Sequence, residues 1–177
     1  MASVYNEGIE DRMATFETEV RTPQAIAAQL TALIDRYPAV VIERDARVVG
    51  FAWTSEYRPR KAYQGVAEFS VYVAREARGQ GAGVQLLSAL IGEAESRGFT
   101  KLVSRIFPEN VASRRLCASL GFREGRHISP ARATRWQVDG LRCRRAPAGR
   151  GGRRLAGAAC PRDGVRVGVF DQRQESL

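Results

Sequence analysis

The stretch "RGQGAG" at residues 78–83 has the composition that most directly indicates chemistry. It stands between residues 65–73, which have strand periodicity, and a run with helical periodicity that starts at about Val84. Glycines let consecutive backbone N–H groups turn towards one point, and a helix start adds partial positive charge. A phosphate or pyrophosphate suits such a loop, and Arg78 can add a direct contact. A glycine-rich turn needed only for close packing is the alternative.

Two nucleotide-binding signatures do not fit this loop. A P-loop ends in Lys-Ser/Thr, whereas Val84 and Gln85 follow here. The dinucleotide fingerprint Gly-x-Gly-x-x-Gly is not matched either, because the third glycine comes one residue early.

The loop matches the acyl-CoA signature of the GNAT superfamily of N-acetyltransferases, Arg/Gln-x-x-Gly-x-Gly/Ala. The second block of that superfamily is matched by "PENVASRRLCASLGF". Further stretches, "VYNEGIEDRMATFETEVRT", "EYRPRKAY" and "AEFSVYV", resemble the phosphinothricin and arsinothricin acetyltransferase branch, so the resemblance covers residues 4–124. It implies an enzyme that uses acetyl-CoA as co-substrate and no metal. Direct transfer to the amino group of a small amino acid with a phosphinate or arsinate group is implied, and methionine sulfoximine-type amino acids also fit.

The resemblance assigns the catalytic positions to the strand "AEFSVYV". Glu68 is the implied general base, because an ammonium must lose a proton before its nitrogen attacks a thioester. The alternative is a partly exposed strand glutamate paired with an arginine. Backbone N–H groups around Val71 and Val73 are implied to stabilise the oxyanion.

Cofactor contacts are implied along the glycine loop and the following block. The pyrophosphate contacts fall to Arg78, Gly79, Gln80, Gly81, Gly83 and Val84. Asn110 is implied to hold the pantetheine arm, a role compatible with capping a helix, and Ser113 is a weaker companion. Cys117 stands where many superfamily members have a tyrosine that donates a proton to the leaving thiolate. For Cys117 we favour a role in packing.

The implied substrate side is aromatic and basic. Arg58 and Arg60 match a basic loop suited to bidentate binding of an anionic group, with solvated loop charge as the alternative. Phe16, Tyr63 and Tyr72 are expected to line the wall.

Alternating strands and helices indicate an α/β domain. We expect a helix over residues 4–12, a helix starting at Thr22-Pro23, and a hairpin that turns at Asp45-Ala46-Arg47. Later elements are a strand in "GVAEFSVYV", a helix from about Val84, a strand in "KLVSRIF" and a helix in "VASRRLCASL". The resemblance implies a GNAT fold: a mixed sheet, splayed at the acyl-CoA cleft, with flanking helices. The family's first strand would lie upstream of Met1.

Residues 125–177 differ from the domain expected over residues 1–124. They hold 12 Arg, no Lys and 4 acidic residues, which accounts for +8 of the net charge of +9. Reverse translation of residues 125–149, read one base later, can give "GVTSARHARRDGKWTDCVVVERLLG", with the histidine, turn and strand typical of the family. We therefore hypothesise a frameshift after Glu124, with a disordered tail, a lost terminal hairpin and an open sheet edge.

Composition bears on the alternative functions and on the expected cellular compartment. A non-catalytic CoA-binding remnant is the second hypothesis, and nucleic-acid binding by the Arg-rich tail is a weak third. Three cysteines without CxxC spacing favour a reducing cytoplasm, and no apolar run is long enough for a membrane span. A homodimer is usual for the resembling branch.

Overall fold

The computed structural model describes residues 1–15, 17–127, 135–142 and 165–170. Its centre is a seven-stranded mixed sheet with the order β5-β6-β4-β3-β2-β1-β7. Among these described strands only the β3–β4 pair is parallel; the other neighbouring strands are antiparallel. The strands are β1 (Ala39–Arg44), β2 (Arg47–Glu56), β3 (Val66–Val73), β4 (Lys101–Ile106), β5 (Arg123–His127), β6 (Arg135–Arg142) and β7 (Val165–Val169).

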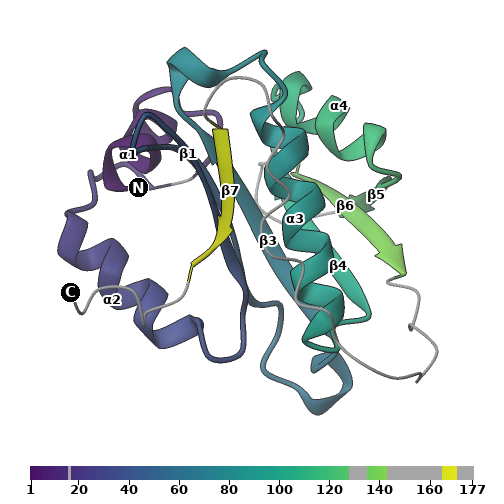
Figure 1. Ribbon diagram of the computed structural model, residues 1–177. Coiled ribbons are helices and arrows are strands. Elements are labelled where there is room, and N and C mark those ends of the chain that lie inside the picture. Colours follow the sequence, from purple (N-terminus) through teal and green to yellow (C-terminus); the bar gives the residue numbers. More distant parts are fainter. Residues whose placement is uncertain (16, 128–134, 143–164, 171–177) are drawn as a thin grey trace.

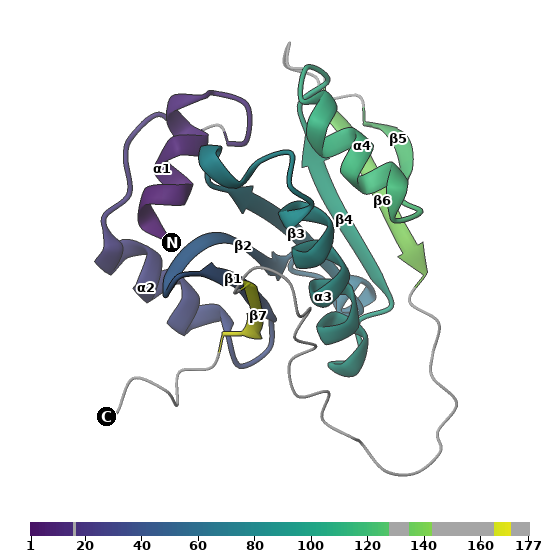
Figure 2. The ribbon, with the colours of Figure 1, turned by 45° about the horizontal axis from the view of Figure 1, so that its top comes forward.

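Helices cover both faces of this sheet. They are α1 (Ala2–Glu10), α2 (Pro23–Leu33), α3 (Ala82–Ser96) and α4 (Val111–Ser119). Figures 1 and 2 show α1 and α2 on one side and α3 with α4 on the other. None of the helices in the described ranges is long and apolar enough to cross a membrane.

Side-chain alternation along the strands builds two cores. Phe69 of β3 packs with the leucines of α3, whereas Tyr72 packs with Phe51, Trp53 and the apolar face of α1 and α2. Phe69 and Tyr72 therefore lie on opposite faces of β3, because successive strand residues point to opposite sides.

Local signals explain where several elements start. Thr22 caps α2 by accepting a hydrogen bond from the Ala25 N–H at 3.1 Å, and Pro23 takes the first helical position. The hairpin turns as expected at Asp45 and Ala46, both with positive φ, which is the geometry of a tight type I′ turn. Helix α3 starts at Ala82, two residues before the expected start, because Gly81 is its N-cap and Gly83 is already helical.

The terminal strands correct one expectation. Strand β6 pairs with β4, and β5 pairs with β6, so the β4 edge is not open and a terminal hairpin is present. Strand β7 pairs antiparallel with β1. Ladder hydrogen bonds are made by the backbone, so a segment without an alternating apolar pattern can still pair. The frameshift remains a prediction, and residues 128–134, 143–164 and 171–177 lie outside the described residues.

Candidate functional site

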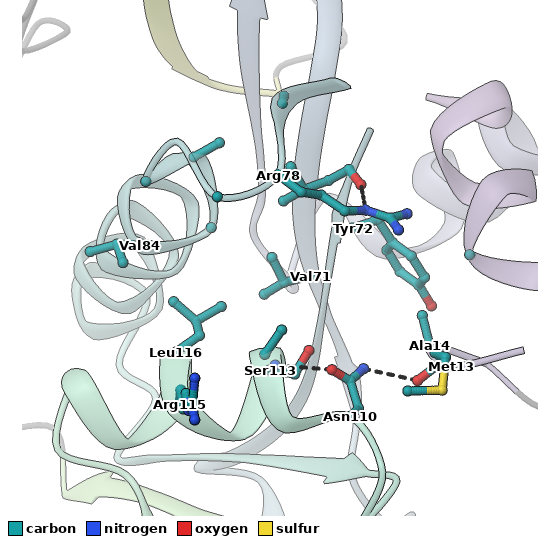
Figure 3. Close-up of a pocket in the computed structure, with 18 of the residues that line it drawn as sticks. Met13, Ala14, Val71, Tyr72, Arg78, Val84, Asn110, Ser113, Arg115 and Leu116 are labelled. Carbon is teal, nitrogen blue, oxygen red and sulfur yellow. Dashed lines mark hydrogen bonds between the residues drawn. The ribbon is translucent and has the colours of Figure 1, made fainter. Parts of the chain in front are cut away.

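Strands β3 and β4 part after a short stretch of pairing. Their parallel register runs only from Val66 opposite Lys101 to Glu68 opposite Val103, although β3 continues to Val73. A cleft of about 770 Å³ is lined by the end of β3, α1 and the loop after it, the glycine loop and α4. Figure 3 shows the side chains that converge on this cleft.

Two backbone amides of β3 point into the gap. The Ala74 N–H donates to the Val49 carbonyl of β2 at 2.9 Å. Amides alternate in direction along a strand, so the N–H groups of Val73 and Val71 point away from β2 and towards the side where β4 has separated. Both residues line the cleft, as the sequence-based assignment of an oxyanion site requires.

The glycine loop closes one end of the cleft with a backbone that favours glycine. Gly79 and Gly81 have φ of +75° and +82°, a region that other residues adopt at a cost. A Cβ at Gly83 would lie 3.2 Å from Leu116 Cδ2 of α4, so the Leu116 side chain would have to shift by a few tenths of an ångström. The first N–H groups of an α-helix have no intrahelical acceptor, and those of α3 begin at this loop. The predicted residues Arg78, Gly79, Gly81, Gly83 and Val84 all line the cleft.

Arg78 forms hydrogen bonds to two other residues that line the cleft. Its Nε donates to the Val73 carbonyl at 2.9 Å and its Nη1 to Asp11 Oδ2 at 2.6 Å. Hydrogen bonds from Arg75, and then from Arg78, hold the pKa of Asp11 below its ordinary value. The guanidinium is thus positioned beside the glycine loop, with a carboxylate that competes for it.

Asn110 joins two walls of the cleft. Its Oδ1 accepts from the Ser113 N–H at 3.0 Å, which caps α4, and its Nδ2 donates to the Met13 carbonyl at 2.9 Å (Figure 3). The capping role expected from the sequence is confirmed. Asn110 and Ser113 both line the cleft, where a pantetheine arm would pass.

A smaller pocket of about 40 Å³ adjoins the cleft and shares Val71 and Asn110 with it. Ser70, Arg105 and Cys117 are among its other lining residues. Cys117 packs in the core next to α3, and burial raises the pKa of its thiol to about 12. This supports the packing role that the sequence favoured.

Glu68 forms a bidentate ion pair that links β3 to β4. Arg105 Nε donates to Glu68 Oε1 and Nη2 donates to Oε2, each at 2.5 Å. The Glu68 side chain is 15% exposed and the Arg105 side chain 49%. The pKa of Arg105 is raised, first by these hydrogen bonds and, more weakly, by the nearby Tyr57. The expected alternative, a pairing with an arginine, is therefore present, and Glu68 lines neither of the two described pockets.

Several predicted residues lie away from both pockets. Gln80 accepts from Arg44 Nη1 at 2.8 Å instead of lining the cleft. Arg58 packs its guanidinium over the rings of Tyr57 and Tyr63, with its carbon 5.1 Å and 5.6 Å from their centroids. Arg58, Arg60 and Tyr63 do not line either described pocket, and Phe16 lies outside the described residues. Tyr72 does line the cleft; its hydroxyl pKa is raised by burial.

The structure adds lining residues that the sequence did not indicate. Asp11, Met13 and Arg115 reach the large cleft, and Arg105 reaches the small pocket. Arg115 lies in the second turn of α4, five residues after Asn110, and this spacing in the sequence could have indicated that it reaches the cleft. Nothing in the local pattern around Asp11 or Arg105 indicates contact with a site more than 30 positions away.

Known proteins resemble the chain over this region. Residues 3–122 match the acetyltransferase (GNAT) family. The phosphinothricin N-acetyltransferase of Alcaligenes faecalis is 34% identical over 124 residues, which are 69% of this chain and 63% of that enzyme. The L-methionine sulfoximine/L-methionine sulfone acetyltransferase of Pseudomonas aeruginosa is 37% identical over 122 residues, covering 68% of this chain and 71% of that enzyme. The chain thus spans less than two thirds of the Alcaligenes enzyme.

A solved structure agrees with the fold. The GNAT superfamily phosphinothricin acetyltransferase from Sinorhizobium meliloti, in complex with acetyl-CoA, superimposes with a TM-score of 0.69. It is 28% identical in sequence, and the match covers 78% of each chain.

Proposed function

Because the chain belongs to the GNAT acetyltransferase family, we propose that it transfers the acetyl group of acetyl-CoA to the amino group of a small amino acid. An amino acid with a phosphinate-type or sulfoximine-type side chain is the proposed substrate class. The observation that carries this proposal is the cleft between the parted strands β3 and β4, with the glycine loop at its end.

The residues of the cleft fit acetyl-CoA. Its volume of about 770 Å³ lies within the range of roughly 300–1,000 Å³ typical of small-molecule sites. The amides at the start of α3 and the guanidinium of Arg78 suit the pyrophosphate, since both bring positive charge to one end of the cleft. Arg115 is a second cation on the wall for a further phosphate.

The proposed chemistry takes place near Val71, which lines both pockets. The amine nitrogen attacks the thioester carbonyl carbon, the C–S bond breaks, and the CoA thiolate leaves. Glu68 accepts the ammonium proton, directly or through one water. The N–H groups of Val71 and Val73 donate to the carbonyl oxygen as its negative charge grows. Burial raises the pKa of the Cys117 thiol, which makes it a weak proton donor, so the thiolate leaves without its help.

A coupled assay tests the proposal. Purified protein is mixed with acetyl-CoA and phosphinothricin or methionine sulfoximine, and CoA release is followed with a thiol reagent while mass spectrometry detects the acetylated amine. Glu68→Gln should lower kcat by about 100-fold or more, as expected for loss of a general base. CoA binding without product in the wild type would support a non-catalytic CoA-binding protein instead. No binding of CoA would contradict the proposal entirely.

A further inference from the structure

The ion pair between Glu68 and Arg105 is the feature of the substrate side that the proposed chemistry leaves unexplained. The carboxylate of Glu68 uses both oxygens on one guanidinium, although a base needs a free lone pair directed at the amine. Arg105 lines the small pocket beside the cleft, and its side chain is about three times as exposed as that of Glu68. The cation is therefore the accessible member of the pair, and the anion lies behind it.

The two charges are complementary to those of an α-amino acid. Such a molecule carries an ammonium and a carboxylate on one carbon atom, so a site that binds it needs an acceptor and a planar pair of donors a few ångströms apart. Glu68 and Arg105 supply these groups from neighbouring strands at the point where β3 and β4 separate. Arg105 lines the small pocket together with Val71, which places this arginine near the proposed position of the acetyl carbonyl.

We propose that Arg105 determines specificity for the substrate's α-carboxylate: its guanidinium turns from Glu68 to that carboxylate, and Glu68 is released to accept the ammonium. The inference rests on the proposed function and identifies how the same site recognises its substrate. Arg105 exchanges one bidentate carboxylate partner for another, so its charge-assisted hydrogen bonds are kept. Glu68 exchanges a guanidinium for an ammonium, so it stays paired as well. Base activation then depends on the arrival of a carboxylate.

The surroundings of the pair make this exchange feasible. The Arg105 side chain is about half exposed, and after the exchange both charges have a new partner, so the largely buried carboxylate of Glu68 is not left unpaired. Ser70 and Ser104 line the same pocket and offer hydroxyl groups to a polar ligand. Tyr57 lies close enough to Arg105 to contribute to the raised pKa of that arginine and also packs against Arg58, so the basic loop lies near the pair.

Matched substrates separate this role from one in which Arg105 only holds Glu68 in place. The amino acid that the wild type acetylates is compared with its C-terminal amide, which keeps the amine but lacks the carboxylate charge. Arg105→Gln should raise KM for the acid by about 10- to 100-fold, which is the loss expected when one hydrogen bond to a charged group is removed. KM for the amide should change less than about threefold, by the same reasoning, since it forms no such bond. Arg105→Lys should be intermediate because an ammonium cannot bind bidentately.

Controls keep the experiment decisive if one variant folds poorly. Arg47→Gln alters an exposed arginine at the start of β2 and should leave both substrates unaffected. The Glu68→Gln/Arg105→Gln double variant removes the unpaired carboxylate, and calorimetry should show that it, too, loses affinity for the acid but not for the amide. An equal fall in kcat for acid and amide with unchanged KM, or an unchanged KM for the acid, would overturn the proposal.

Failure of the proposed function gives a different result. If the wild type acetylates no amino acid, calorimetric binding of phosphinothricin or methionine sulfoximine to protein with CoA still tests Arg105. Binding that Arg105→Gln abolishes supports the carboxylate contact without catalysis, whereas no binding overturns both proposals.

Discussion

Replacing Gly81 by alanine tests the glycine loop at the position where the backbone requires glycine. Gly81 has φ of +82° and is the N-cap of α3. Within the described part of the chain nothing lies within 4 Å of a Cβ at this position, so the substitution adds backbone strain without a collision. A side chain in this left-handed region costs roughly 1–2 kcal/mol.

This strain must appear in one of two measurements. If the loop keeps its conformation in the free protein, unfolding becomes easier, and Tm falls by about 2–4 °C for each kcal/mol in a chain of this size. If the loop relaxes, acetyl-CoA must restore the conformation, and Kd rises by about 5- to 30-fold for the full cost. Calorimetric titration and thermal unfolding of the same variant together account for the strain.

Gly92→Ala is the matched control within the same helix. Gly92 is exposed, and its φ is not in the left-handed region. An added Cβ would meet no atom of the described residues within 4 Å. Alanine should stabilise the helix by about 1 kcal/mol and leave Kd unchanged. A Gly81→Ala protein with wild-type Tm and wild-type Kd would refute the reasoning about the loop.

Three further predictions concern residues around the cleft. Asn110→Ala should lower the free energy of unfolding by about 1 kcal/mol because the cap of α4 is lost. Asn110→Asp should keep the cap and lose the hydrogen bond to the Met13 carbonyl, so that only Kd for CoA rises. Equal losses of stability for the two variants in urea titrations or thermal melts would contradict this. Burial raises the Cys117 pKa to about 12, so the thiol's contribution to stability is present below the unfolded pKa of about 8.5 and falls as pH rises above that value. Cys117→Ala should therefore flatten the decline in Tm between about pH 8 and 10. An unchanged slope of Tm against pH would count against this prediction. Asp11→Asn should tighten CoA binding by about 1.5- to 5-fold at low salt, because a carboxylate that competes for Arg78 is neutralised; weaker binding would show that Asp11 is needed to orient that arginine.

Local sequence patterns were sufficient to predict most of the fold. The Thr22-Pro23 signal, the alternation in "GVAEFSVYV" and the glycines before α3 report short-range constraints, and these elements formed close to where their patterns placed them. Helix α1 spans Ala2–Glu10, two residues earlier than the expected range 4–12. The start of α3 was misplaced because Gly83 reads as loop from its type, although its backbone is helical. Strand β6 was missed because its pairing with β4 depends on backbone hydrogen bonds, which leave little trace in residue types.

The site was predictable only where residues act through the backbone or a contiguous motif. The glycine loop, Val71, Val73 and Asn110 meet in one cleft, as expected. The Glu68–Arg105 pair joins residues 37 positions apart, and its existence depends on the register between β3 and β4. A single sequence contains no direct measure of that register, so the general alternative of an arginine partner could be stated but the arginine could not be identified.

Loop side chains were the least predictable part of the site. Gln80 belongs to the cofactor motif, yet its amide accepts from Arg44 and donates to the Glu76 carbonyl. Arg58 packs on aromatic rings beside the sheet. Long polar side chains in loops have several hydrogen-bond partners within reach. Which partner each side chain binds depends on tertiary contacts that the local sequence does not encode.

A structure of the protein crystallised with acetyl-CoA tests the central claim most directly. We expect the pyrophosphate oxygens within hydrogen-bonding distance of the amides at residues 79–83, and the thioester carbonyl beside the Val71 N–H. Acetyl-CoA bound at another surface, or a glycine loop that does not contact phosphate at saturating ligand, would contradict the account.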